Sequence, residues 1–185
     1  MEFTKYELYD LLNRRGPLYL PDVDFSSAFL DNVHMEGAYL RRANLKGATL
    51  WWAKLTGADL FGANLEGADM YGASLDRAML NEANLNNVIL IKAELTCTKF
   101  IGANLIGADL TEAHMKYTNL TGAKLNKAKL IGAEICVPDL TGADLTEANL
   151  TGAKLTLKES GFPDKTDLRK AILTHTIMPD GSVHE

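Results

Sequence analysis

The sequence predicts an all-β solenoid, because it contains an unbroken repeat of five residues and a fixed alternation within each repeat. Every fifth residue from Leu20 to Leu155 is apolar, and these 28 positions hold 22 Leu, three Met, two Phe and one Ile. The residue two places earlier is Ala in 21 of the 28 units. A period of five fits neither the 3.6-residue period of a helix nor the two-residue period of a long strand. The chain is therefore expected to turn once in every unit.

Each unit is predicted to consist of three extended residues followed by a two-residue corner. In the triplet Ala-x-Leu, alternation points Ala and Leu inward and the middle residue outward. The second corner residue is Gly in 12 units, for example Gly37, Gly57 and Gly62, and glycine suits a corner that needs positive φ. Successive coils can then stack at about 4.8 Å with parallel pairing, and only the stack buries the apolar side chains.

The repeating pattern A(D/N)LxG resembles that of the pentapeptide-repeat family. It is clearest in ADLFGANLEGADM (58–70), ANLIGADL (103–110) and ADLTEANLTGAKL (143–155), and it covers residues 18–157. The resemblance implies a right-handed quadrilateral parallel β-helix with four units, or 20 residues, in each of about seven coils. The sequence itself supports this coil length, because Asn44, Asn64, Asn84 and Asn104 recur at intervals of 20.

Three segments are predicted along the chain. Residues 1–17 form an N-terminal helical cap, with a short amphipathic helix over residues 3–15 that covers the first coil. Residues 18–157 form the β-helix, and residues 158–185 form a loop, a partial coil and a C-terminal tail. The partial coil is predicted because Leu168, Leu173 and Met178 resume the five-residue spacing in a shifted phase. The central core of the β-helix is predicted to contain Leu45, Leu65, Leu85, Leu105, Leu125 and Leu145.

No set of residues predicts catalysis, a cofactor or a metal site. By strand spacing, Cys97 and Cys136 lie about 9–10 Å apart on outward corners, too far for a disulfide. His34 and His114 share a column but lie four coils apart, too far to bind one metal. The acidic residues face outward on a convex surface with no pocket to shift their pKa values, and the Asp and Asn residues before the central Leu are expected to hydrogen-bond nearby or adjacent-coil backbone. We expect no enzyme activity.

Charge and hydropathy restrict the partners and the location. The net charge is −5, and residues 18–157 carry 16 acidic and 12 basic side chains, a balance that disfavours binding to nucleic-acid phosphates. No apolar run reaches the ~18 residues that span a bilayer, and the N-terminus lacks a secretory apolar core. We expect a cytoplasmic monomer that binds a protein partner, with no direct nucleic-acid binding and no membrane association.

An outward apolar stripe is the candidate binding surface. The column that begins at Trp51 continues every 20 residues, Trp52 lies beside it, and Phe61 and Ile101 are expected to extend the apolar area on a neighbouring face. One interpretation is that these side chains pack only on one another along the ladder; the other is that they bind a protein, for which Trp and Tyr are common anchors. The candidate residues are Phe29, Trp51, Trp52, Tyr71, Ile89, Ile91 and Ile131.

Two classes of function are consistent with these features. The first is a non-catalytic protein-interaction or regulatory scaffold. The family resemblance implies such a role in cyanobacterial cell differentiation or signalling, because cyanobacterial members include a regulator of heterocyst differentiation that acts by binding other proteins. The alternative is a DNA mimic that inhibits or protects DNA gyrase, as the quinolone-resistance branch of the family does. Lys124, Lys127 and Lys129 interrupt the acidic surface that such mimicry requires.

Overall fold

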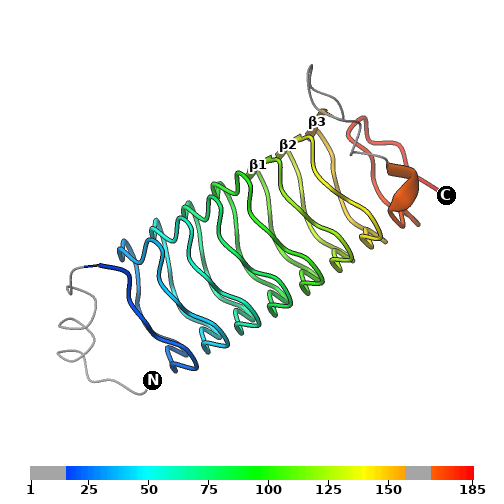
Figure 1. The fold of residues 1–185 in the computed structure, drawn as a ribbon. Helices are drawn as coiled ribbons and strands as arrows, with labels where there is room; N and C mark the ends of the chain where they lie inside the picture. Colours follow the sequence, from blue (N-terminus) through cyan, green and yellow to red (C-terminus); the bar gives the residue numbers. More distant parts are fainter. Residues whose placement is uncertain (1–15, 157–167) are drawn as a thin grey trace.

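The chain winds into coils that stack along one axis. The computed structural model describes residues 16–156 and 168–185, and Figure 1 shows the first described coil at one end of the stack and residues 168–185 at the other. On each side of a coil, the middle residue of the five-residue unit forms a parallel bridge with the residue 20 places later, for example Tyr19 with Tyr39 and Asp24 with Asn44. The structure thus has the predicted solenoid architecture and 20-residue coil. Most of the predicted helical cap lies outside the described residues.

Four columns of bridged residues define four faces, which we name by one member each. In chain order around a coil they are the Tyr19 face, the Asn44 face, the Phe29 face and the His34 face. Two faces whose residues are ten positions apart in the chain lie on opposite sides of the coil. The Tyr19 face is therefore opposite the Phe29 face. We call the corner between the Phe29 and His34 faces the Trp51 edge, and the diagonally opposite corner, between the Tyr19 and Asn44 faces, the Phe61 edge.

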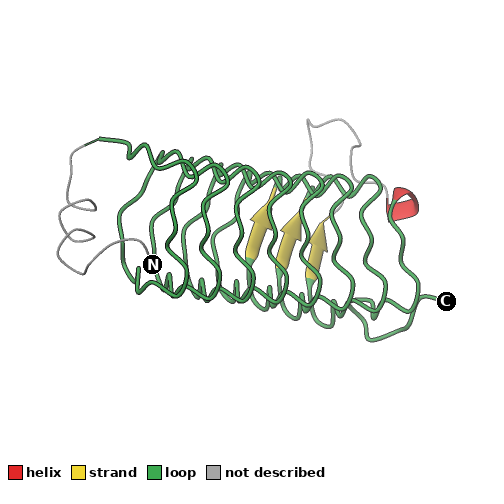
Figure 2. Ribbon diagram, turned by 90° about the horizontal axis from the view of Figure 1, so that it is seen from below, coloured by secondary structure: helices red, strands yellow, loops and turns green. Residues whose placement is uncertain are grey.

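Within the described chain, regular strands occur only on the His34 face. They are β1 (His114–Lys116), β2 (Glu134–Cys136) and β3 (Lys154–Thr156), which form a parallel sheet in the order β1-β2-β3 and lie side by side in Figure 2. The other parallel pairings are single-residue bridges. Short strands follow directly from the repeat, because a corner interrupts the extended backbone after every three residues.

The apolar columns fill the interior of the coil. All six predicted core leucines are buried, and the exposed fraction is 0% for Leu85 and 2% for Leu145. The void that leucines line in the C-terminal half has a volume of about 10 Å³, which is about the space of one water molecule. This void is too small to hold a ligand.

Two threonines replace alanine in an inward column and are fully buried. The Thr98 hydroxyl donates to the Leu75 carbonyl at 2.8 Å, and the Thr118 hydroxyl donates to the Leu95 carbonyl at 3.1 Å. A buried hydroxyl without a partner would be destabilising. Hydrogen bonds to the backbone of the adjacent coil therefore offset the cost of burying these two hydroxyls.

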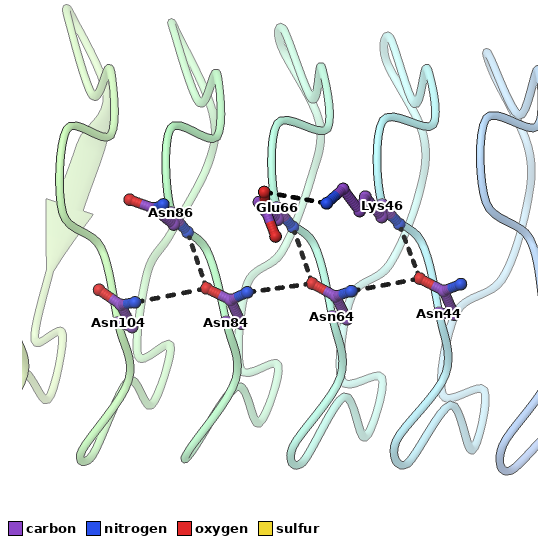
Figure 3. A network of polar contacts seen from close by, with 7 residues as sticks. All are labelled: Asn44, Lys46, Asn64, Glu66, Asn84, Asn86 and Asn104. Carbon is purple, nitrogen blue, oxygen red and sulfur yellow. Dashed lines mark hydrogen bonds and ion pairs between the residues drawn. The ribbon is translucent and has the colours of Figure 1, made fainter.

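A ladder of asparagine side chains crosses four coils on the Asn44 face (Figure 3). The Asn64 amide donates to Asn44 Oδ1 at 3.3 Å, Asn84 donates to Asn64 at 3.1 Å, and Asn104 donates to Asn84 at 3.4 Å. Each Oδ1 also accepts the backbone N–H two residues later, as in the bond from Glu66 to Asn64. The expected side-chain bonds to nearby backbone are confirmed here, and bonds between side chains of adjacent coils are added to them.

The C-terminal residues form a partial coil and then turn back on it. Asp144 bridges in parallel to Ile172, 28 rather than 20 residues later, so the repeat resumes after a phase shift. The partial coil begins at the short 3-10 helix η1 (Leu168–Lys170). Beyond Ile177 the direction reverses, and Val183 pairs with Ile177 in antiparallel orientation. The segment expected to be a tail thus includes a hairpin.

Every second corner residue from Asp22 to Gly152 has positive φ. This conformation is easy for glycine and costs roughly 1–2 kcal/mol for other residues. Val137, at φ 48°, is the β-branched residue in this set, and β-branched residues tolerate the left-handed region least. Backbone strain is therefore concentrated at the corner before Pro138.

We predict that Leu85→Ala lowers the free energy of unfolding by about 2–5 kcal/mol, because it leaves a cavity in a fully buried column. Chemical denaturation followed by circular dichroism measures this change. The control is Lys99→Ala, at an exposed outward position, which should change stability by less than about 0.5 kcal/mol. A similar small effect at both positions would contradict the inward assignment of Leu85.

We predict that Val137→Gly raises the free energy of unfolding by about 1 kcal/mol, because relief of the left-handed strain exceeds the entropic cost of glycine. The matched control is Arg77→Gly, at an unbranched residue of the same column with φ 60°, where the two effects nearly cancel. The denaturation midpoints of both variants should be compared with that of the wild type. Equal shifts would show that branching at Val137 adds no strain.

Candidate protein-binding surface

The Trp51 edge gathers three aromatic rings from two adjacent coils. The ring centroids of Trp51 and Tyr71 lie 6.4 Å apart, and those of Trp52 and Tyr71 lie 5.5 Å apart in an edge-to-face arrangement. About half of each indole remains exposed, 48% for Trp51 and 53% for Trp52. Tyr71 thus lies against both indoles, and together the three side chains form one aromatic cluster on a convex edge.

The two tryptophans do not play the same part in this cluster. Trp52 lies in the left-handed corner position, at φ 57°, and its ring covers Gly72 so closely that a Cβ there would come within 2.5 Å of the indole carbons Cε3 and Cζ3. Glycine at position 72 therefore permits Trp52 to pack on the next coil. Trp51, at the first corner position, is anchored differently, because its backbone N–H donates to Asp31 Oδ1 at 3.0 Å.

A cation extends the aromatic cluster toward the C-terminal coils. Lys92 Nζ lies 6.0 Å from the centroid of the Tyr71 ring and 3.5 Å from Glu112 Oε2. The Tyr71 phenol, followed by the Glu112 carboxylate, raises the pKa of Lys92. The ammonium group therefore stays protonated beside the ring, and an ion pair of Lys92 with Glu112 borders the aromatic cluster.

Of the other predicted stripe residues, only Ile91 directly follows the cluster in its column. Ile91 follows Tyr71 in the same column and is half-buried, whereas Thr111 separates it from the exposed Ile131. Phe29 and Ile89 lie on the Phe29 face, where two polar residues, Thr49 and Asp69, stand between them in the column. The contiguous part of the stripe is therefore Trp51, Trp52, Tyr71 and Ile91.

The expectation that Phe61 and Ile101 extend this surface is wrong. Both residues lie on the Phe61 edge, ten residues or half a coil away from the Trp51 column. In a four-sided coil, half a coil leads to the opposite edge rather than to a neighbouring face. The two edges therefore cannot contact one flat partner surface together.

A second aromatic group, which the sequence reasoning missed, lies at the N-terminal end of the Tyr19 face. The Tyr19 and Tyr39 rings lie 5.7 Å apart. Beside them, the Arg41 guanidinium lies 4.4 Å above the Phe61 ring and bonds Asp59 Oδ2 at 3.1 Å. The 20-residue spacing of the two tyrosines was the available signal for this group. Its arginine is already paired with a carboxylate of the next coil.

Ion pairs between adjacent coils neutralise many of the outward carboxylates. Such exposed pairs each contribute little to stability, and together they involve seven of the 16 acidic side chains of residues 18–157. The Arg42–Asp22 pair is bidentate, with Arg42 Nε and Nη2 at 2.6 and 2.8 Å from the Asp22 carboxylate. The pairs are Arg42–Asp22, Arg41–Asp59, Lys46–Glu66, Lys92–Glu112, Lys129–Asp109, Lys127–Glu147 and Lys154–Glu134.

Hydrogen bonds stabilise the charged form of three carboxylates, those of Asp22, Glu134 and Asp144. Hydrogen bonding to Arg42 lowers the pKa of Asp22, and hydrogen bonding to Lys154 lowers the pKa of Glu134. Burial raises the pKa of Asp144, but hydrogen bonds, with that from Thr146 the largest, bring the net pKa below its usual value. These carboxylates are therefore held in the charged form, which suits an ion-pair partner better than a general acid.

The residues first considered for chemistry remain separate. Cys97 and Cys136 are free, half-buried thiols, and His34 and His114 lie beside Glu36 and Glu94 respectively. Within residues 16–156 and 168–185, no group of three His, Cys, Asp or Glu side chains is placed to hold a metal ion. Among the same described residues, no helix is long and apolar enough to cross a membrane.

Comparisons with known proteins agree with the repeat and the fold. The family model for pentapeptide repeats matches eight copies, over residues 20–57, 53–90, 93–132 and 139–157. The search of curated proteins gave no match. Among solved structures, the chain is similar to a pentapeptide repeat protein from the thylakoid lumen of Arabidopsis thaliana. The identity is 39% over 52% of this chain and 67% of that one, with a TM-score of 0.51.

Two further solved structures cover more of the chain with lower similarity. HetL, a pentapeptide repeat protein involved in heterocyst differentiation regulation from the cyanobacterium Nostoc, is 26% identical over 99% of this chain and 100% of its own, with a TM-score of 0.48. Full-length QnrB1, a plasmid-mediated fluoroquinolone resistance protein, is 21% identical over 88% and 82%, with a TM-score of 0.36. Since the family model matches well over half of its residues, this chain belongs to the pentapeptide-repeat family, whose members form right-handed quadrilateral β-helices.

Proposed function

We propose that this chain is a non-catalytic scaffold that binds a protein partner through the Trp51 edge. The observation that carries the proposal is the contiguous group of Trp51, Trp52 and Tyr71, with about half of each indole exposed to solvent. Trp and Tyr are the residue types that most often dominate binding energy at protein interfaces. The setting predicted from the sequence, cell differentiation or signalling in a cyanobacterium, and a monomeric, cytoplasmic rod belong to the same proposal.

The fold supports binding over catalysis as the general class of function. The interior is filled by leucine and alanine, and its void of about 10 Å³ leaves no room for a substrate. The family consists generally of non-catalytic scaffolds and often mediates protein interactions. What distinguishes this chain within such a fold is therefore the set of side chains on its outer columns, and the aromatic cluster is the largest such feature along the Trp51 edge.

Packing along the ladder is the competing explanation for the cluster. It accounts well for Trp52, whose ring covers Gly72. It accounts less well for Trp51, whose ring contacts Tyr71 only at a tilted 6.4 Å and stays half exposed. The two explanations differ in what they expect from truncating the exposed rings, because an interface residue contributes to affinity and a packing residue contributes to stability.

We predict that the double substitution Trp51→Ser, Tyr71→Ser weakens partner binding more than about tenfold, a change of 1.4 kcal/mol, and changes the melting temperature by only a few degrees. The measurement is affinity capture from lysate of the source cell, with bound proteins identified by mass spectrometry and the affinity of the recovered partner then measured. The control is Ile101→Ser, an exposed apolar residue on the opposite edge. A large loss of stability with unchanged capture would show that the cluster serves packing alone.

The alternative function, mimicry of DNA toward DNA gyrase, has less support. Lysine and arginine side chains interrupt the acidic surface that would imitate phosphates, and they pair with seven of the 16 acidic side chains of residues 18–157. We therefore expect no inhibition of gyrase supercoiling, and no protection against a quinolone, at protein amounts stoichiometric with the enzyme. The assay compares supercoiled product with and without the purified chain. Inhibition of gyrase at stoichiometric amounts would favour DNA mimicry over the protein-binding scaffold.

A further inference from the structure

The Phe61 edge contains a guanidinium site that the chain fills with an arginine of its own. The site consists of an aromatic residue at a first corner position, Phe61, an aspartate two residues earlier, Asp59, and the first corner residue of the preceding coil, Arg41. Asp59 Oδ1 accepts the Phe61 backbone N–H at 3.1 Å, and Asp59 Oδ2 accepts from Arg41 Nη1 at 3.1 Å. The guanidinium lies 4.4 Å from the centroid of the Phe61 ring. One carboxylate thus holds the corner backbone and a stacked cation together.

The Trp51 edge repeats this arrangement ten residues later, but without the cation. Tyr71 is the aromatic first corner residue, and Asp69 is the aspartate two residues earlier, whose Oδ1 accepts the Tyr71 backbone N–H at 3.2 Å. The preceding coil contributes Trp51 at the position where the other edge has its arginine. Within the described residues, Asp69 has no ion-pair partner and its Oδ2 accepts no hydrogen bond. The aromatic and anionic parts of a guanidinium site are therefore present, and the positive charge is missing.

A second carboxylate lies beside Trp51 on the preceding coil. Asp31 is exposed, its Oδ1 accepts the Trp51 backbone N–H at 3.0 Å, and within the described residues it has no ion-pair partner. Lys92, at the other end of the cluster, is already paired with a glutamate, and Lys54 lies on the His34 face. The exposed indole of Trp51 is therefore flanked by the unpaired carboxylates of Asp31 and Asp69, a charge that is complementary to a cation from a partner.

An aromatic ring beside a carboxylate fits arginine better than lysine. A planar guanidinium can stack on a ring while its edge donates to a carboxylate, whereas an ammonium group is a compact and strongly hydrated charge. Tryptophan is the aromatic side chain that attracts cations most strongly. Because Trp51 itself stands at the position of the internal arginine, the guanidinium must approach from solvent, on the half of the indole that is exposed.

We propose that the Trp51 edge recognises an arginine side chain of the partner protein, which stacks on Trp51 and pairs with Asp69. This inference rests on the proposed function, since it takes the same edge as the partner-binding surface, and it adds the chemical group that the edge selects. Asp31 contributes a second negative charge beside the indole. The partner's arginine completes on this edge the set of ring, carboxylate and guanidinium that Arg41 completes on the opposite edge.

The first test titrates the full chain with a capped tripeptide, glycine-arginine-glycine. Trp51 and Trp52 are the two tryptophans of the sequence, so their fluorescence and the NMR signals of their indole N–H groups report binding at this edge. We expect a saturable change at millimolar peptide that decreases with added salt, a weaker change with lysine in place of arginine, and none with citrulline, the neutral isostere. Equal responses to arginine and citrulline would overturn the proposal, and so would no response to arginine.

The substitution Asp69→Asn removes the charge but keeps an acceptor for the Tyr71 N–H, as Asn119 does for Thr121 at 2.9 Å. We expect it to weaken binding of the arginine peptide about threefold to fivefold, the scale of an exposed ion pair, with an unchanged melting temperature. The matched control is Asp139→Asn, because the Asp139 carboxylate bonds a corner N–H in the same way but has a threonine at that corner. Equal binding by the two variants would exclude Asp69 as the recognising carboxylate.

The recovered partner separates this inference from the proposed function. If the Trp51→Ser, Tyr71→Ser variant loses the partner while Asp69→Asn binds it with wild-type affinity, the scaffold function stands and the arginine contact is rejected. If the tripeptide binds specifically but the double serine variant still captures the partner, the arginine site stands and the scaffold function of this edge is rejected. The contact is supported when replacing one partner arginine by glutamine weakens binding to the wild type but not to Asp69→Asn, because such non-additivity identifies two groups that interact directly.

Discussion

Backbone pairing between residues 20 places apart is the interaction on which the rest of the structure depends. It aligns equivalent residues of successive coils, so every side-chain column is a consequence of the same set of hydrogen bonds. The pairing in turn needs a corner after every third extended residue, and the positive φ of each second corner residue supplies it. Glycine meets this requirement freely, whereas Val137 meets it under strain. The Asn ladder and the ion pairs between coils follow from the alignment rather than cause it.

Structural features that repeat could be predicted from the sequence. Features that depend on the direction in which a side chain points around the coil could not. The five-residue spacing identified the buried columns, and Asn44, Asn64 and Asn84 identified the 20-residue coil. The relation of Phe61 to Trp51 was misjudged, because the sequence shows their separation of ten residues but not that half a turn leads to the opposite edge. The contact of Trp52 with Gly72 also depends on side-chain orientation, which columns alone do not specify.

The C-terminal end shows a different limit of pattern reading. The shifted spacing of Leu168 and Leu173 revealed that the repeat resumes, since apolar periodicity is independent of the intervening loop. The hairpin of residues 178–184 has no such periodicity, and its antiparallel pairing depends on a turn held by Gly181 at φ 84° and by the Asp180 side chain, which accepts from the backbone N–H and hydroxyl of Ser182. A turn residue after a last apolar position predicts a change of direction, but it does not specify which edge the returning strand covers.

The regular stack also determines which outward positions are free to vary in their side chains. Second corner residues are limited by their positive φ, so the first corner residue and the middle residue of each unit are the positions with free choice of side chain. Trp51, Tyr71 and Ile91 all occupy first corner positions of consecutive coils, and consecutive coils lie about 4.8 Å apart. A partner that contacts all three therefore meets a continuous surface, whereas Ile131 is reached only across Thr111. The contiguity of the cluster, rather than the number of exposed apolar residues, is what supports the proposal that the Trp51 edge binds a protein.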